Sequence, residues 1–295
     1  MKSYISTLFF SCIALICLCG SVWAEDLDDI LRSGTLKHLG IPYANFVTRE
    51  GQGLDVELMQ AFANYLGVKY QFVESTWQDI ITDLTGIKIK VEGDTVTRIG
   101  TSPKKGHIIS TGFTVLPWRK KTVSFSDKTF PSGIWLVARS DSPLTPIKPT
   151  GDMEKDIELV KKQLKGFSIL GLKDSCLAPA LYGIDQTGAI IRYFPPNGDL
   201  SEMIPSVIAK NADATLIDVP VALMGLAKWP GKIKVIGPVS KPQEMACAFT
   251  QDSPKLQQAF AKFFATFKQE GKYRAIVRKY YPSVFSYYPD FLADR

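Results

Sequence analysis

Between residues 35 and 84, short apolar runs alternate regularly with amphipathic segments, and few folds accommodate that order. Residues 35–41 and 68–73 each predict a strand, and a second helix is expected from about Trp77 to Leu84. Between the two strands, apolar residues recur on one helix face until Gly67 ends the helix: Leu54, Leu58, Met59, Phe62 and Leu66. Alternating strands and helices favour a parallel sheet flanked by helices, so we predict an α/β protein.

The same alternation returns in the second half of the chain. Strands are expected at residues 166–172, 189–194, 213–218 and 234–239, and helices at 175–182, 199–210, 254–267 and 273–280. Prolines at 143, 146 and 149 mark a change of composition between the halves. We predict two lobes, each a mostly parallel sheet flanked by helices, facing each other across a cleft. Lobe 1 is expected to span residues 25–133 plus 246–295, because the last helices return to it, and lobe 2 residues 134–245.

An interruption at residues 86–105 breaks the first alternation. Two runs of strand-forming residues, 88–91 and 95–99, flank Glu92-Gly93-Asp94, which is typical of a hairpin turn. We therefore predict a β-hairpin inserted on the surface of lobe 1.

The first 24 residues have the layout of a signal peptide. Lys2 precedes an apolar run over residues 8–19, and Val22-Trp23-Ala24 supplies small residues for cleavage. The run is shorter than the roughly 20 apolar residues that span a bilayer. We expect a soluble, periplasmic mature protein, while a lipid anchor on Cys17 or Cys19 and an uncleaved N-terminal anchor stay open.

Composition excludes several classes of partner. Removing residues 1–24 leaves 271 residues with a formal charge of +5, because Lys2 is the one charge lost. No basic stripe interleaves with exposed aromatics, so we expect no nucleic-acid partner. With two histidines, His38 and His107, and no metal-ligand cluster, we expect no metal and no cofactor. For Cys176 and Cys247, a disulfide and two buried thiols both stay open.

One arginine stands out as a candidate for binding an anion. A buried carboxylate needs a bidentate cation and neutral donors, because an unpaired buried charge is strongly unfavourable. Arg119 lies just beyond a strand expected to end at Thr114, so its guanidinium, that hydroxyl and N–H groups near Gly112 could converge on one anion. The alternative is that residues 119–121 form a solvated basic turn.

The second half of the chain offers two further positions. A helix opening at Ser175 would present free N–H groups to an anion, although Asp174 could cap that helix and compete with it. Asp218 ends an apolar strand, and the carboxyl ends of such strands face the crevice where open α/β sheets bind ligands. It would suit an ammonium group, and a cap before Val219-Pro220 is the alternative.

Aromatic residues end the first two strands. Tyr43, Phe46 and Trp77 could stack on a ligand or clamp its apolar part. A core position is the alternative for each, and for Phe46 most of all.

In their order along the chain, these residues resemble the polar amino-acid-binding family of periplasmic solute-binding proteins. The resemblance covers nearly the whole mature chain and rests on GLDVEL (53–58), LG (66–67), Trp77, Thr114, RKK (119–121), FS (125–126) and ADATLID (212–218). It implies a type II periplasmic-binding-protein fold with two hinge crossings, and hinge closure around a small carboxylate-bearing solute such as an amino acid. It also implies delivery to the membrane permease of an ABC importer, by a protein that we expect to be a monomer.

The resemblance assigns ligand-binding roles to eight residues. It gives the α-carboxylate to Arg119 with Thr111, Thr114, Ser175 and Cys176 beside it, the α-ammonium to Asp218, and the ligand side chain to Tyr43 and Trp77. Three positions depart from the family. Asp174 replaces a common glycine and Cys176 a common threonine or serine, which alters the carboxylate site. Gly40 stands where binders of basic amino acids carry an acid, which argues against lysine, arginine or ornithine as ligand.

Two other functions stay open. Periplasmic dehydratases acting on cyclohexadienyl amino acids are similar in architecture, and a cleft acid of raised pKa could protonate a leaving hydroxyl. Because the cleft candidates already have binding roles, we expect no enzyme. The altered site and the hairpin would also suit a sensor or accessory protein of another periplasmic system. The chain is similar as well to the binding domain of certain murein-cleaving enzymes, although with its end at Arg295 we expect no catalytic domain.

Overall fold

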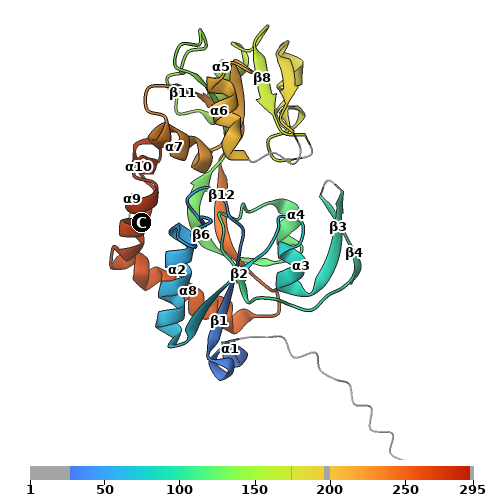
Figure 1. The fold of residues 1–295 in the computed structure, drawn as a ribbon, viewed down its shortest axis with the longest axis vertical. Coiled ribbons are helices and arrows are strands. Elements are labelled where there is room, and N and C mark those ends of the chain that lie inside the picture. The colour runs from blue at the N-terminus through green and yellow to red at the C-terminus, as the bar shows by residue number, and fades with distance from the viewer. Residues whose placement is uncertain (1–26, 93, 174, 196–199, 293–295) are drawn as a thin grey trace, which may run out of the picture.

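The computed structural model describes residues 27–92, 94–173, 175–195 and 200–292. These residues form two lobes, one above the other in Figure 1, each built on a five-stranded sheet. The predicted signal peptide and the proposed cap Asp174 lie outside the described residues. Among the residues that are described, no helix is both long and apolar enough to cross a membrane.

The sheet of the first lobe has the order β2-β1-β5-β12-β6. Its strands are β1 (Thr35–Gly40), β2 (Lys69–Glu74), β5 (Ile108–Ile109), β6 (Ser124–Ser132) and β12 (Gln243–Phe249). β1 pairs in parallel with β2 and β5, whereas β12 is antiparallel to both β5 and β6. The sheet is therefore mixed, with β12 running against the other four strands, because β6 carries the chain out of this lobe and β12 brings it back.

Seven helices of the described residues belong to the first lobe. They are α1 (Leu27–Ser33), α2 (Leu54–Leu66), α3 (Ile80–Thr85), α4 (Pro117–Lys120), α8 (Pro254–Gln269), α9 (Lys272–Tyr280) and α10 (Val284–Tyr287). The apolar face of α2 is buried as its periodicity predicts, and Phe62 packs edge-on against Phe260 of α8, 5.1 Å between ring centroids. α2 contacts both α8 and α9, so the last helices return to the first lobe as expected.

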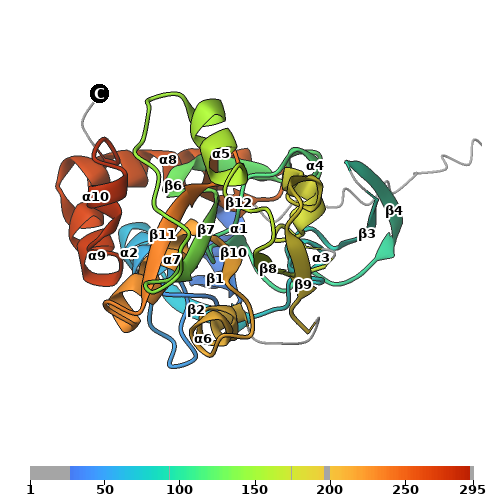
Figure 2. The same ribbon diagram turned by 90° about the horizontal axis from the view of Figure 1, so that it is seen from above.

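The sheet of the second lobe has the order β11-β7-β10-β8-β9. Its strands are β7 (Ile134–Arg139), β8 (Ser168–Gly171), β9 (Ile190–Tyr193), β10 (Ala214–Asp218) and β11 (Ile233–Pro238). The parallel pairs are β8 with β9 and with β10, while β7 is antiparallel to β10 and β11. The helices α5 (Met153–Lys161), α6 (Met203–Ile208) and α7 (Val219–Lys228) pack on this sheet, as Figure 2 shows from above.

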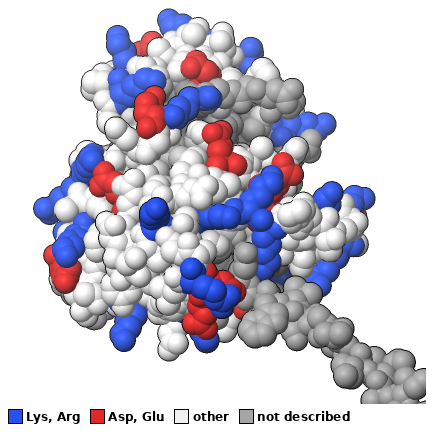
Figure 3. All heavy atoms as spheres, turned by 60° about the horizontal axis from the view of Figure 1, so that its bottom comes forward, with Lys and Arg blue, Asp and Glu red and all other residues white. Residues whose placement is uncertain are grey.

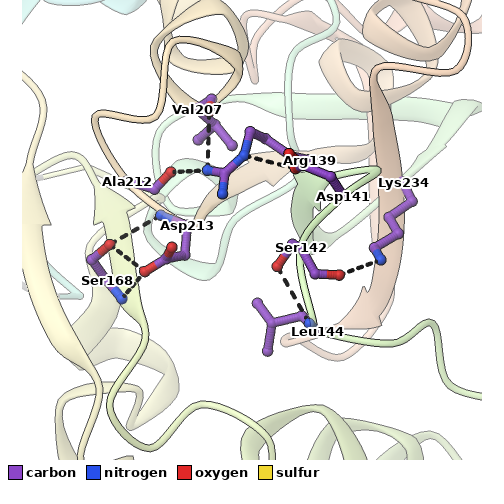
Figure 4. A network of polar contacts seen from close by, with 9 residues as sticks. All are labelled: Arg139, Asp141, Ser142, Leu144, Ser168, Val207, Ala212, Asp213 and Lys234. Atoms are coloured by element: carbon purple, nitrogen blue, oxygen red, sulfur yellow. Dashed lines mark hydrogen bonds and ion pairs between the residues drawn. The ribbon is translucent and has the colours of Figure 1, made fainter.

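A polar network holds the beginnings of β8 and β10 together (Figure 4). The carboxylate of Asp213 accepts hydrogen bonds from the Ser168 backbone N–H at 2.8 Å and from its hydroxyl at 2.6 Å. Beside it, the guanidinium of Arg139 donates to the Ala212 carbonyl at 3.0 Å. The first part of the ADATLID motif therefore serves the architecture of the lobe rather than a ligand.

The chain crosses between the lobes twice, and the two crossings lie side by side. Gly133 separates β6 from β7, and residues 239–242 connect β11 to β12. The Ser240 hydroxyl accepts a hydrogen bond from the Ile134 N–H at 2.8 Å, and the Val239 N–H donates to the Ile134 carbonyl at 2.9 Å. The lobe boundaries set at 133/134 and 245/246 stay a prediction; the second falls inside β12.

The predicted hairpin forms from β3 (Ile87–Glu92) and β4 (Thr95–Thr101). The two strands pair only with each other within the described chain, so the hairpin joins neither of the large sheets. It projects beyond the first lobe in both Figure 1 and Figure 2.

Candidate ligand-binding site

Side chains from the two lobes meet where the sheets face each other. Tyr43 follows β1, and its hydroxyl donates a hydrogen bond to Oδ2 of Asp218, the last residue of β10. The other oxygen, Oδ1, accepts from the Val221 N–H at 3.2 Å, so that Asp218 also caps α7. Asp218 thus fills both roles that its sequence position allowed: helix cap and a carboxylate facing the opposite lobe.

The environment of this pair shifts both groups toward their neutral forms. Burial raises the pKa of Asp218 to about 6, although the hydrogen bonds from Tyr43 and Val221 oppose the rise. The pKa of Tyr43 is raised well above its ordinary value by burial and by the negative charge of Asp218. At neutral pH a protonated phenol therefore donates to a carboxylate that is largely ionised.

Arg119 lies on α4, the short helix that begins at Pro117. Its Nη1 donates to the Thr114 carbonyl at 2.8 Å, and its Cζ lies 4.0 Å from the centre of the Phe113 ring. Burial lowers the pKa of Arg119 to about 10, so the group stays charged at neutral pH. Nε is buried without a hydrogen-bond partner, and none of the ion pairs within the described chain includes Arg119. It is neither a solvated turn residue nor locked to an internal acid.

The loop before Arg119 differs from the sequence prediction. β5 ends at Ile109 rather than at Thr114, because Gly112 takes a φ of +61° that no strand contains. A Cβ at Gly112 would lie 2.5 Å from the Phe46 ring, and its N–H donates to Oδ2 of Asp55 at 2.6 Å. The N–H expected to face an anion is therefore occupied, and Thr114 contributes the carbonyl that orients Arg119.

The Thr111 hydroxyl is not brought into the site. It donates to the Ile41 carbonyl at 2.7 Å and accepts from the Ile41 N–H at 3.1 Å, and the residue is fully buried. Thr111 ties the loop after β5 to the end of β1.

The helix predicted to open at Ser175 does not form. Residues 175–178 make a turn, and a 3₁₀ helix begins only at Pro179 (Pro179–Tyr182). Ala178 is extended because the residue before a proline is driven out of the helical region. The Ser175 hydroxyl bonds within the turn, donating to the Leu172 carbonyl at 2.9 Å and accepting from the Leu177 N–H at 3.0 Å. The proposed helix-end anion site is therefore wrong.

Cys176 lies near both charges of the site. It is exposed, its carbonyl accepts from the Tyr182 hydroxyl at 2.5 Å, and its thiol is free. Partial desolvation and the negative charge of Asp218 raise the pKa of the thiol to about 12, while Arg119 acts in the opposite direction. Cys247 is a buried free thiol, 3.2 Å from the Ser110 hydroxyl, so the two cysteines are not paired with each other.

The aromatic candidates divide into a surface pair and a core residue. The Tyr43 ring stacks on Phe46 at 5.9 Å between centroids and meets Trp77 edge-on at 5.5 Å. Trp77 is 44% exposed, whereas Phe46 is completely buried. Tyr43 thus contacts both Asp218 and the partly exposed Trp77, and Phe46 supports Tyr43 from the core.

Gly40 ends β1 beneath an aromatic ring. A Cβ added there would lie 2.6 Å from Cε2 of Phe72, closer than real Cβ atoms approach a neighbour. A side chain of any kind at position 40 would require Phe72 to move. The absence of an acid at this position is therefore part of the packing of the lobe.

Asp55 has a role that the sequence reasoning missed. It lies in the first turn of α2, is 2% exposed, and holds the Gly112 N–H while its Oδ1 has no hydrogen-bond partner. Burial raises its pKa to about 7, although the Gly112 N–H and the nearby Ser110 hydroxyl favour the charged carboxylate. The sequence signal that could have revealed this role is an acid between the apolar residues Leu54 and Val56. A buried acid needs a polar partner, so its place among buried residues predicts one.

Two cavities of the described chain lie elsewhere. One of about 460 Å³ is lined in part by Tyr182 and Ser240, and one of about 690 Å³ in part by Arg32 and Lys37. Neither lining includes Arg119 or Asp218. Among the described residues, no group of three or more His, Cys, Asp or Glu side chains could hold a metal ion.

Two α/β lobes with adjoining crossings, and polar groups from both lobes meeting between them, define a two-lobed periplasmic binding protein of type II. Residues 31–283 match the bacterial extracellular solute-binding proteins, family 3, and the chain belongs to this family. It is a solute-binding protein.

Three similar proteins illustrate the range of the family fold. The arginine-binding extracellular protein ArtP of Bacillus subtilis is 23% identical, over 95% of this chain and 98% of its own. The membrane-bound lytic murein transglycosylase F of Desulfosudis oleivorans is 22% identical over 79% of this chain, which spans only 44% of that protein. A solved ancestral amino acid-binding protein, described as a precursor of cyclohexadienyl dehydratase, is 25% identical with a TM-score of 0.62, covering 86% of this chain and 98% of its own.

Proposed function

We propose that the protein captures an amino acid with a non-basic side chain between its lobes and delivers it to the permease of an ABC importer. Arg119 binds the α-carboxylate and Asp218 the α-ammonium. The observation that carries this proposal is the half-buried guanidinium of Arg119, whose Nε has no hydrogen-bond partner and which forms no ion pair among the described residues.

A carboxylate ligand matches what Arg119 lacks. Nη1 is already used by the Thr114 carbonyl, so Nε and Nη2 form the fork that remains for a bidentate carboxylate. Burying a cation without a counter-ion is unfavourable, and an anionic ligand removes that cost on binding. Cys176, close enough for the charge of Arg119 to affect the pKa of its thiol, borders the same space from the second lobe.

An ammonium group can bind Asp218 by exchanging hydrogen bonds with the Tyr43 hydroxyl. The carboxylate accepts a hydrogen bond from the Tyr43 hydroxyl, and an ammonium would replace or share that bond with up to three donors. Because the pKa of Asp218 is about 6, the carboxylate is available to a cation above that pH. Tyr43 then remains beside Trp77 to contact the ligand side chain.

The side-chain preference follows from Gly40 and Phe72. ArtP is named for arginine, and the family resemblance places an acid at the Gly40 position in binders of basic amino acids. The Phe72 ring fills that place here, which leaves no counter-charge for a basic side chain. A neutral or aromatic side chain packed against Trp77 and Tyr43 suits the remaining surface.

Closure of the lobes is the proposed working step. The paired crossings at Gly133 and Ser240 supply a hinge, and a ligand that joins Arg119 to Asp218 would hold the two lobes together. We propose that the protein is exported by a cleaved signal peptide, acts in the periplasm as a monomer, and presents its closed form to the permease.

Binding rather than catalysis is proposed for this site. A dehydratase needs a proton donor, and Asp218 with its raised pKa is the one acid that the described site supplies. That acid is already assigned to the ammonium. Incubation with arogenate and prephenate should give no product by absorbance or chromatography, and turnover abolished by Asp218→Asn would establish the enzyme instead.

A thermal-shift screen of amino acids and small carboxylates on the mature protein tests the proposal. A ligand at 100 times its dissociation constant should stabilise the protein by about 2.7 kcal/mol. The shift should disappear in Arg119→Met and persist in Lys120→Met, a matched loss of charge at the exposed neighbouring residue. A shift that survives in Arg119→Met would show that the anion site is elsewhere, and arginine as the best ligand would refute the side-chain preference.

A further inference from the structure

The β3–β4 hairpin presents an open strand edge that the solute-binding function does not use. β4 pairs with β3 along one edge, and its other edge has no partner strand in the described part of the chain. The main-chain N–H and C=O groups on that side can pair with another extended segment. In Figure 1, β4 is the outermost strand of the molecule on its side.

The two faces of the hairpin differ in character. Ile89, with its cross-strand partner Arg98, lies on the face that packs toward the first lobe, where Ile89 meets the core around Leu39 and Ile80. Lys88 and Lys90 alternate with these residues and lie on the outer face, both exposed. Lys90 forms an ion pair with Glu92 on the same face, 2.7 Å between Nζ and Oε1, so this outer face carries two lysines and one glutamate. It has a net positive charge, while the inner face anchors the hairpin.

The hairpin and the residues next to it carry more basic than acidic side chains. Residues 86–105 contain five Lys and Arg residues against two Asp and Glu residues. Figure 3 shows basic side chains at the right-hand edge of the molecule, where the hairpin projects. An acidic partner would be attracted to this surface and a basic one repelled.

The hairpin is also held in place rather than left as a free arm. The ammonium group of Lys121 donates to the Asp94 carbonyl in the hairpin turn at 2.7 Å, and the Lys88 stem lies against Gly100. Ile99, at the irregular step of the β3–β4 pairing, is 62% exposed. A fixed strand edge with one exposed apolar side chain is pre-organised for a protein segment.

We propose that β4 and the lysine face of the hairpin form a docking site for an extended, acidic segment of a partner protein, which adds to the hairpin as a third strand. Main-chain pairing along β4 supplies the register, Lys88 and Lys90 select acidic side chains, and Ile99 receives an apolar one. The unpaired edge favours a peptide over a lipid surface, because a lipid headgroup lacks the repeating N–H and C=O groups that pair with a strand edge.

A labelled ten-residue peptide of alternating Thr and Glu with one central Val is the probe. Fluorescence anisotropy should show that it binds the mature protein, with an affinity that falls as the salt concentration is raised. Binding should also slow hydrogen exchange at the β4 amides. A peptide of the same charge with two central prolines should bind at least tenfold more weakly, because proline cannot donate to a strand ladder.

Two pairs of charge reversals locate the surface. Lys88→Glu with Lys90→Glu should weaken peptide binding at least tenfold, whereas Lys155→Glu with Lys262→Glu, on exposed faces of α5 and α8, should not change it. The melting temperature of both double variants confirms that they fold. The proposal is overturned if the proline peptide binds equally well, if the hairpin reversal has no effect, or if anionic phosphatidylglycerol vesicles bind the hairpin while the peptide does not.

Discussion

Arg119 and Asp218 present opposite charges to the same space between the lobes, yet their hydrogen-bond partners differ. Asp218 already accepts hydrogen bonds from the Tyr43 hydroxyl and the Val221 N–H. Among the described residues, Arg119 donates a hydrogen bond to the Thr114 carbonyl and leaves its Nε without a partner. A ligand therefore exchanges one hydrogen bond for another at the acid but supplies missing ones at the arginine. The carboxylate end of the ligand should contribute more to affinity than the ammonium end.

The largest loss of affinity is expected when Arg119, which binds the carboxylate end of the ligand, is replaced, and a smaller loss when Asp218 is replaced. Arg119→Met should weaken binding of the best amino acid by at least 100-fold, about 3 kcal/mol, because the variant leaves a buried carboxylate unpaired. Asp218→Asn should weaken it by about tenfold, since the amide oxygen still caps α7 and the hydroxyl of Tyr43 stays available. Titration calorimetry measures both. A greater loss in Asp218→Asn than in Arg119→Met would reverse the comparison.

Substitutions of Asp55 test how the loop that precedes Arg119 is held in place. Because its pKa is raised in the folded protein to about 7, the stability that it contributes is present below about pH 4 and is lost as pH rises through 7. Asp55→Asn keeps an oxygen for the Gly112 N–H and removes the buried charge. Unfolding in urea should show a gain on the order of 2 kcal/mol at pH 8 and little change at pH 4.

Asp55→Leu serves as the control for this prediction. It removes the acceptor as well as the charge, so the loop leading to Arg119 loses its hold at Gly112. We expect lower stability and weaker ligand binding in this variant. Equal behaviour of the Asn and Leu variants would show that the hydrogen bond does not position the loop.

The role of Asp218 in binding should be visible in the pH dependence of ligand affinity. Protonation of Asp218 removes the charge that binds an ammonium, so affinity should fall by up to tenfold per pH unit below about pH 6. Because the Tyr43 hydrogen bond lowers the pKa of Asp218, Tyr43→Phe should move this fall to higher pH. A carboxylate ligand without an ammonium group should show neither effect. A pH profile that is the same in both proteins would exclude Tyr43 from the pair.

The smallest effect is expected from the aromatic wall. Trp77→Leu should weaken binding by a few-fold, about 0.5 to 1 kcal/mol, because the ring is partly exposed and is one of two aromatics at the site. Tyr193→Leu removes a comparably exposed ring from β9 in the other lobe and should leave affinity unchanged. A loss above tenfold in Trp77→Leu would make the ring a principal contact.

Much of the fold could be predicted because burial imposes a periodicity on the sequence. The helix α2 and the strand β10 are found where their apolar patterns predict them. Strand direction was not predictable in this way, because β6 and β12 run antiparallel only as a result of the chain leaving and re-entering the first lobe. The helix expected at Ser175 failed for a local reason, since Pro179 prevents the preceding residue from being helical.

The candidate site shows the same limit. Arg119 and Asp218 could be proposed from the sequence because a charge after a predicted apolar strand is visible locally. The partners of Thr111 and Gly112 were not, because the Thr111 hydroxyl binds Ile41, 70 positions away, and the Gly112 N–H binds Asp55, 57 positions away. Local patterns show which groups are polar, whereas the fold decides which of them are left free for a ligand.

The place of β12 in the first sheet has a consequence for the order in which the molecule is built. β12 lies between β5 and β6, so the first sheet cannot be completed until residue 249 is present, whereas all five strands of the second sheet lie within residues 134–238. A chain emerging from its N-terminus can therefore finish the sheet of its second lobe while the first sheet still has a gap between β5 and β6. The segment made first is among the last to reach its final structure.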